Sequence, residues 1–179
     1  INTKTINGLG LGLRFDHFDE IIKSKPKTPW FEVIVEDFLS EGPHHKKLEK
    51  LREDYPIALH SIGLNLGGVD AFDIDHLNKF KEIYQRFEPS WISDHLCWSA
   101  INGVKHHDLL PIPRTEEALK NARDRISYFQ DFFNRQLVIE NITAYIDYKE
   151  SVFSEIEFLN EIVKSTGCGL LLDITNARI

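Results

Sequence analysis

The sequence has few cysteines, no long apolar run and a shortage of positive charge. Its only cysteines, Cys97 and Cys168, form no CxxC motif, which argues against a disulfide framework or a cysteine-rich zinc site and favours a reducing cytoplasm. No apolar run approaches the length of a membrane span, and the first residues show no signal-peptide pattern. With 28 acidic and 21 basic residues, the net charge is −7. We therefore expect neither a nucleic-acid nor a membrane partner.

A phosphate-binding fingerprint is missing as well. The segment GLGLGLRF, residues 8–15, contains glycines but lacks GxGxxG spacing between a strand and a helix. What the sequence does contain is an alternation of short apolar segments with amphipathic ones. The predicted strands are Leu9–Phe15, Trp30–Glu36, Ile57–Ile62, Trp91–Leu96, Gln136–Asn141 and Gly169–Thr175.

Helical patterns separate the later strands. Apolar residues recur at helical spacing between residues 77 and 87 and between 119 and 133, and Ser154 with Glu157 predicts a capping box for a further helix that stops at Gly167. Strict alternation suits either a doubly wound sheet or most of a (β/α)₈ TIM barrel. We expect the barrel, as one α/β domain over residues 1–179 that holds about the first six βα units and is incomplete at the C-terminus.

The strand ends are the reason for preferring the barrel. Five consecutive predicted strands end in side chains that commonly bind metals, and parallel barrel strands would bring these ends to one mouth, where such enzymes keep their active sites. Ionised groups on apolar strands are costly unless they are paired or bound to a metal. Each residue alone could be a strand-end or helix cap, but together they predict a polynuclear metal or acid–base site. The residues are Glu36, Asp37, His60, Asp94, His95, Glu140, Asn141, Asp173 and Asn176.

Histidines and carboxylates together suit iron, manganese or zinc. The segment VKHHDLLPIPRT, residues 104–115, is predicted to be a loop, and its His106–His107 pair is either a surface feature or faces the substrate. The remaining histidines, at positions 17, 44, 45 and 76, are predicted to be solvated and have no assigned role.

Seven motifs in order resemble the MbnB-like family of TIM-barrel multinuclear iron enzymes, whose members include the oxidase of methanobactin biosynthesis. They are GLGLR, FEVIVEDFL, LHSIGLNLGG, SDHLCWS, HDLLPIPRT, LVIENIT and TGCGLLLDITN. The resemblance covers almost the whole chain. It implies a (β/α)₈ barrel and a non-haem iron, oxygen-dependent oxidoreductase of natural-product biosynthesis. Such enzymes modify cysteines of ribosomally made peptides, often with a small partner protein that delivers the peptide.

The resemblance also implies roles for individual residues. Metal ligands for two or three iron ions, with zinc or manganese as alternatives, would be His60, His95, Glu140, Asp173 and Asn176. Glu36, Asp94 and His107 are predicted to be catalytic, with Glu36 outside the ligand set. Departures from the family pattern at Asp37, Ser61 and Ile142 leave the substrate open, since the first two alter the rim of the site.

Two other functions fit the same residues. One is a divalent-metal isomerase or hydrolase of the xylose-isomerase-like barrels, and the other is a non-catalytic metal-binding or peptide-binding remnant. The sequence stops after the sixth predicted strand, before the strands from which the family supplies further ligands. We therefore expect either a piece of a longer protein or an open barrel that self-associates through its exposed strand edges.

Overall fold

A computed structural model describes residues 6–177 of the chain. It contains a six-stranded sheet in the order β1-β2-β3-β4-β7-β8, and the pairs β1–β2, β2–β3 and β7–β8 are parallel. All six predicted strands are therefore confirmed, with shorter bounds. They are β1 Leu11–Gly12, β2 Phe31–Ile34, β3 Ile57–Ser61, β4 Ile92–His95, β7 Leu137–Glu140 and β8 Gly169–Leu171.

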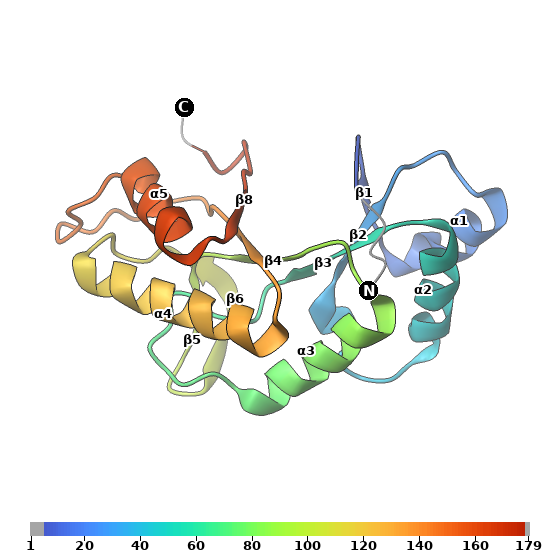
Figure 1. The fold of residues 1–179 in the computed structure, drawn as a ribbon, viewed down its shortest axis with the longest axis horizontal. Coiled ribbons are helices and arrows are strands. Elements are labelled where there is room, and N and C mark those ends of the chain that lie inside the picture. The colour runs from blue at the N-terminus through green and yellow to red at the C-terminus, as the bar shows by residue number, and fades with distance from the viewer. Residues whose placement is uncertain (1–5, 178–179) are drawn as a thin grey trace. The chain divides into compact units, whose positions relative to one another are not determined.

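Helices follow the strands as the alternation predicts (Figure 1). The predicted capping box is present at Ser154, and Gly167 ends that helix with a positive φ of 68°. Along residues 6–177 we find no helix whose length and apolar character would allow it to cross a membrane. The helices are η1 Phe15–His17, α1 Phe18–Ser24, η2 Val35–Phe38, α2 Pro43–Asp54, α3 Ile74–Phe87, α4 Glu116–Phe133 and α5 Glu155–Thr166.

The chain forms two compact units. Unit 1 comprises the chain up to Ser61 together with Asp73–Ile92, and unit 2 comprises Ile62–Phe72 together with the chain from Ser93 onward. In unit 1, α1 and α2 pack side by side (Figure 1). Strands β2 and β3 supply buried apolar side chains to the core. In unit 2, α4 and α5 pack against each other. That residues 1–179 form a single domain stays a prediction.

Some histidines predicted to be solvated are buried in unit 1. His45 is 2% exposed, and its Nε2 lies 2.9 Å from the Phe38 carbonyl oxygen. His76 is 7% exposed. Both lie on the apolar face of their helices, His45 three residues before Leu48 and His76 four residues before Phe80, so the helices carry them into the core.

The segment after β4 differs from the predicted loop. Trp98–Ile101 and Val104–Leu110 form the antiparallel hairpin of β5 and β6 in unit 2. Its turn residues, Asn102 and Gly103, both have positive φ, 51° and 74°. An Asn-Gly pair between two strands is the preferred sequence of a tight hairpin turn, because both central residues of that turn need a left-handed backbone. His107 thus belongs to a strand.

Two strand ends also differ from their predicted bounds. After β2 the backbone turns into η2, so Glu36 lies in a 3-10 turn beyond the strand. After β8 the chain leaves the sheet, so Asp173 and Asn176 lie in the segment that follows the strand. The polar ends of these predicted strands belong to turns because their side chains bond to nearby backbone and hydroxyl groups, which competes with strand pairing.

Candidate metal centre

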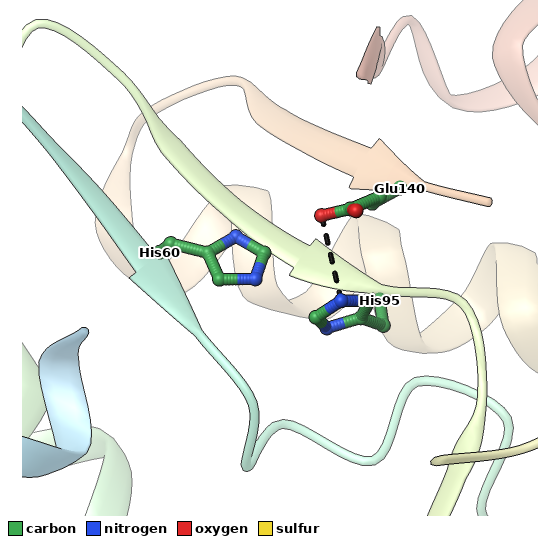
Figure 2. Close-up of side chains that lie close together, drawn as sticks. All are labelled: His60, His95 and Glu140. Carbon is green, nitrogen blue, oxygen red and sulfur yellow. Dashed lines mark ion pairs between the residues drawn. The ribbon is translucent and has the colours of Figure 1, made fainter. Parts of the chain in front are cut away.

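The best-defined pair of site residues comes from the ends of β4 and β7 in unit 2. His95 is the last residue of β4 and Glu140 the last residue of β7, and they are 9% and 8% exposed. Figure 2 shows their ion pair, with 3.4 Å between His95 Nε2 and Glu140 Oε2. The Leu96 amide donates to the Glu140 carbonyl at 3.0 Å. This backbone bond joins the two strand ends.

Burial decides the charge state that this pair favours. It lowers the pKa of His95 by desolvating the imidazolium, and the Asp173 carboxylate opposes part of that shift. A neutral imidazole is the form that binds a metal ion. A carboxylate as buried as Glu140 requires a nearby cation or hydrogen-bond donors. The pair therefore has the chemistry of a cation site.

His60 lies near the end of β3, in unit 1, and is 6% exposed. Like His95 and Glu140 at the ends of β4 and β7, it is a buried side chain of a type that binds metal ions. Two imidazoles and one carboxylate are a donor set for iron, zinc or manganese. His95 and Glu140, two of the five predicted ligands, therefore form a buried pair in unit 2, and metal binding by His60 stays a prediction.

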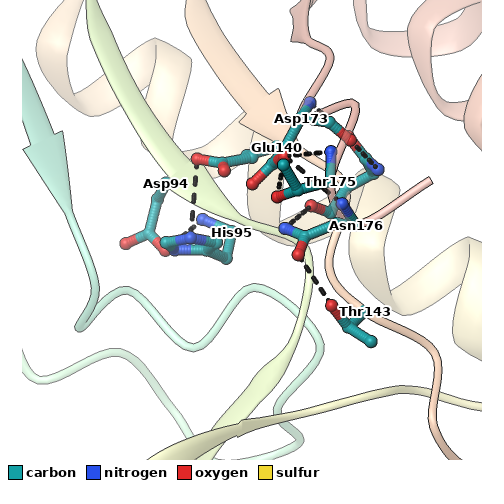
Figure 3. Close-up of polar contacts among 8 residues, drawn as sticks. Asp94, His95, Glu140, Thr143, Asp173, Thr175 and Asn176 are labelled. Carbon is teal, nitrogen blue, oxygen red and sulfur yellow. Dashed lines mark hydrogen bonds and ion pairs between the residues drawn. The ribbon is translucent and has the colours of Figure 1, made fainter.

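Asp173 and Asn176 lie in a hydrogen-bonded turn after β8 (Figure 3). The Thr175 amide and hydroxyl donate to Asp173 Oδ1 at 2.7 and 2.6 Å, and these bonds lower the pKa of Asp173. Thr143 donates its hydroxyl to Asn176 Oδ1 at 2.7 Å. Asp173 is therefore oriented by Thr175 within the turn and Asn176 by Thr143 of the segment after β7, and their binding of a metal stays a prediction.

Asn141 positions this turn, a role that the sequence pattern did not predict. Its side-chain amide donates to the Asp173 carbonyl at 3.1 Å and accepts from the Asp173 amide at 2.8 Å. The Asn176 side chain donates to the Asn141 carbonyl at 3.1 Å. Asn141 follows Glu140 directly, so this pairing links the chain after β7 to the chain after β8.

Asp94 is fully buried and lies beside His95 on β4. Its Oδ2 accepts from the Leu64 amide at 2.9 Å and its Oδ1 from the His95 amide at 2.5 Å. These contacts hold the loop that follows β3 against the end of β4. A positioning role fits them directly, and the catalytic role predicted for Asp94 stays a prediction.

Glu36 belongs to a different cluster in unit 1. The Ser61 hydroxyl donates to Glu36 Oε1 at 2.7 Å, and the same oxygen lies 3.9 Å from His76 Nε2. The side chain of His107 lies outside the described side chains. The predicted catalytic roles of Glu36 and His107 therefore stay predictions.

An open pocket of about 420 Å³ in unit 2 has His95 in its wall. Tyr145, from the segment after β7, donates its hydroxyl to Asp108 Oδ2 of β6 at 3.2 Å across this pocket. Burial, and secondarily the Asp108 carboxylate, raise the pKa of Tyr145, so its hydroxyl stays a donor. The sequence pattern assigned no role to Tyr145. The remaining lining residues are Leu109, Ile142, Thr143 and Asn176.

The fold and the site define a partial (β/α)₈ barrel with a candidate metal centre at its strand ends. A sequence model of the RiPP precursor modification enzyme family MbnB/TglH/ChrH matches residues 8–179, so the chain belongs to this family. The RiPP class comprises ribosomally made, post-translationally modified peptides. The resemblance inferred from the seven motifs is thereby confirmed.

Curated relatives carry no activity in their names. The chain is 38% identical over 174 residues to UPF0276 protein AM1_3026 of Acaryochloris marina. The aligned region covers 97% of this chain and 63% of the relative. It is 40% identical over 178 residues to UPF0276 protein Anae109_1558 of Anaeromyxobacter sp., covering 99% and 63%. The chain thus spans a little under two thirds of the length of these relatives.

Solved structures support the barrel. D-allulose 3-epimerase from Methylomonas sp. superposes with a TM-score of 0.58 at 13% identity, over 93% of this chain and 63% of that one. Endonuclease IV from Thermus thermophilus superposes with a TM-score of 0.55 at 15% identity, over 92% and 61%. At these identities the likeness shows the fold alone, and it confirms the predicted partial barrel.

Proposed function

We propose that this chain carries part of the metal centre of a non-haem iron enzyme that oxidises a cysteine of a ribosomally made peptide. The observation that carries the proposal is the buried pair of His95 and Glu140 at the ends of β4 and β7, in a chain of a peptide-modifying family. His60 is the third ligand in this proposal. Two or three iron ions, a peptide-delivering partner protein and the catalytic roles of Glu36, Asp94 and His107 belong to the same proposal.

The side chains fit such a metal. His60, His95 and Glu140 would hold it, because imidazole nitrogen and carboxylate oxygen are ordinary ligands of iron, and the set contains no thiolate. Bound iron supplies one-electron chemistry with oxygen, which no side chain of the group can perform. Asp94 fixes the backbone of His95, and Asn141 fixes the turn that contains Asp173. These contacts keep the ligand-bearing strand ends in place without the metal.

Metal analysis together with oxygen uptake tests the proposal. The chain is purified without oxygen from iron-supplemented cells, its metals are quantified by mass spectrometry, and oxygen consumption is followed after a cysteine-containing peptide is added. We expect bound iron and oxygen consumption that needs the peptide. The matched control is the same peptide with serine in place of cysteine, which should consume no oxygen because the reacting sulfur is absent.

The alternatives give different results. Bound zinc or manganese without oxygen uptake contradicts the oxidase and favours a divalent-metal isomerase or hydrolase on this barrel. A chain that retains no metal contradicts both enzymes and favours a non-catalytic peptide-binding role. Size measurement in the same preparation tests whether the chain self-associates.

A further inference from the structure

The pocket beside His95 has a polar wall that the metal group does not use. Asp108 on β6 and Tyr145 after β7 face each other there through the hydrogen bond from the Tyr145 hydroxyl to Asp108 Oδ2. Asp108 Oδ1 accepts a second bond, from the Leu109 amide at 2.9 Å. A carboxylate has about four acceptor positions. Two positions on Asp108 therefore remain for a group that enters the pocket.

The hydroxyl groups that line this pocket donate hydrogen bonds to other groups of the protein. Tyr145 donates to Asp108, and Thr143 donates to Asn176 Oδ1. The Asn176 side-chain amide donates to the Asn141 carbonyl. Among the described lining residues there is no lysine or arginine. The pocket consequently presents acceptors and one carboxylate, which favours a ligand that donates hydrogen bonds and carries positive charge.

We propose that Asp108, held in place by Tyr145, binds a positively charged group of the peptide close to the cysteine that reacts. This inference rests on the proposed function and names the substrate class that the site selects. The group is an ammonium or guanidinium, from a lysine or arginine side chain or from the free amino terminus. Because His95 lines the same pocket, a group bound to Asp108 places the neighbouring part of the peptide beside the metal group. The net charge of −7 also attracts cationic peptides.

Asp108 is exposed, so the expected contribution is modest. A solvent-exposed ion pair contributes up to about a 5-fold change in affinity. Tyr145 keeps the carboxylate oriented and lies on the same wall, so removing its hydroxyl should lower the preference for charge without abolishing it. Asp108 is thus a specificity-determining residue and Tyr145 a positioning residue.

Peptide binding to the iron-loaded chain without oxygen, followed by fluorescence anisotropy, tests this assignment. The probes are short capped peptides with one cysteine and, beside it, lysine, norleucine or glutamate. We expect the lysine peptide to bind about 5-fold more tightly than the norleucine peptide and the glutamate peptide to bind most weakly. Asp108→Asn should abolish the difference, and Tyr145→Phe should reduce it. The matched control is Asp131→Asn, the same change at an exposed position of α4, which should leave the preference intact.

A further arm separates the two sources of charge. If Asp108 binds the free amino terminus, an uncapped norleucine peptide binds more tightly than the capped one. If Asp108 binds a side chain, the capped lysine peptide binds more tightly than the capped norleucine peptide. Equal binding of all peptides, or a charge preference that survives Asp108→Asn, overturns this inference and leaves the iron oxidase standing. A chain that binds no cysteine peptide refutes the inference and the proposed peptide substrate together. Circular dichroism verifies that each variant is folded.

Discussion

Two histidine–glutamate pairs, one in each unit, contain the same side-chain types and differ in their surroundings. In unit 2, His95 Nε2 lies 3.4 Å from Glu140 Oε2, and both side chains are 11% exposed. In unit 1, His76 Nε2 lies 3.9 Å from Glu36 Oε1, with side-chain exposures of 7% and 21%. Glu36 and Glu140 both end an apolar strand pattern. The strand-end pattern alone predicts both glutamates to lie at the metal or acid–base site.

The difference lies in what holds each carboxylate. Glu140 is the last residue of β7, fixed in the sheet by the backbone bond from Leu96, and its carboxylate lies beside His95 of the same unit. Glu36 sits in the 3-10 turn after β2, where the Ser61 hydroxyl donates to it at 2.7 Å. A carboxylate that a neighbouring hydroxyl satisfies is stable without a metal. We therefore interpret the first pair as a ligand pair, and Glu36 as a residue outside the ligand set whose contact with Ser61 needs no metal.

Replacing Glu140 with glutamine should produce the largest effect. Glu140→Gln keeps the shape of the side chain but removes the negative charge that a divalent ion needs. We expect metal affinity to fall by about 100-fold or more, since even residues behind the ligands contribute 10- to 100-fold. Iron content after dialysis against a weak chelator measures it. Glu150→Gln, the same change at an exposed position, serves as the control. Full iron retention by Glu140→Gln would remove Glu140 from the ligand set.

The identical change in unit 1 should have a smaller effect. Glu36→Gln leaves a carbonyl oxygen that still accepts from the Ser61 hydroxyl, so the turn should keep its structure. We expect metal affinity to fall by less than about 10-fold, the lower bound for groups that act behind ligands. Iron content is measured in parallel with Glu140→Gln. A loss equal to or greater than that of Glu140→Gln would show that Glu36 is itself a ligand.

Structural features that depend on a local sequence pattern could be predicted from the sequence. The positions of His60, His95 and Glu140 at buried strand ends were predictable, because each follows an apolar strand pattern, and their metal binding stays a prediction. The hairpin that was predicted to be a loop has its own local signal, the Asn102–Gly103 turn. The burial of His76 was readable from its helical register with Phe80.

The rest depends on contacts between distant residues. Asn141 and Asp173 are 32 residues apart, and nothing local to either indicates that a side-chain amide will pair with both backbone groups of the other. The pairing of Tyr145 with Asp108 spans 37 residues and requires the β5–β6 hairpin, which was predicted to be a loop. The predicted strand extended to Glu36, whereas the backbone turns after β2 and the Glu36 side chain accepts from the Ser61 hydroxyl.

Removing the Ser61 hydroxyl should have the smallest effect and sharpens the comparison most directly. Ser61 is fully buried, and Ser61→Ala takes away the donor at 2.7 Å from Glu36 while leaving the carboxylate and the backbone of β3 in place. If the unit 1 pair is structural, the metal-free chain should lose about 1 kcal/mol of unfolding free energy, the usual contribution of one hydrogen bond. Urea unfolding measures this loss, with Ser40→Ala at an exposed position as the control.

Iron content should stay at the wild-type value, because the hydroxyl is not among the proposed ligand atoms. Unchanged stability combined with lost iron would reverse the interpretation and assign the Glu36 cluster to the metal centre.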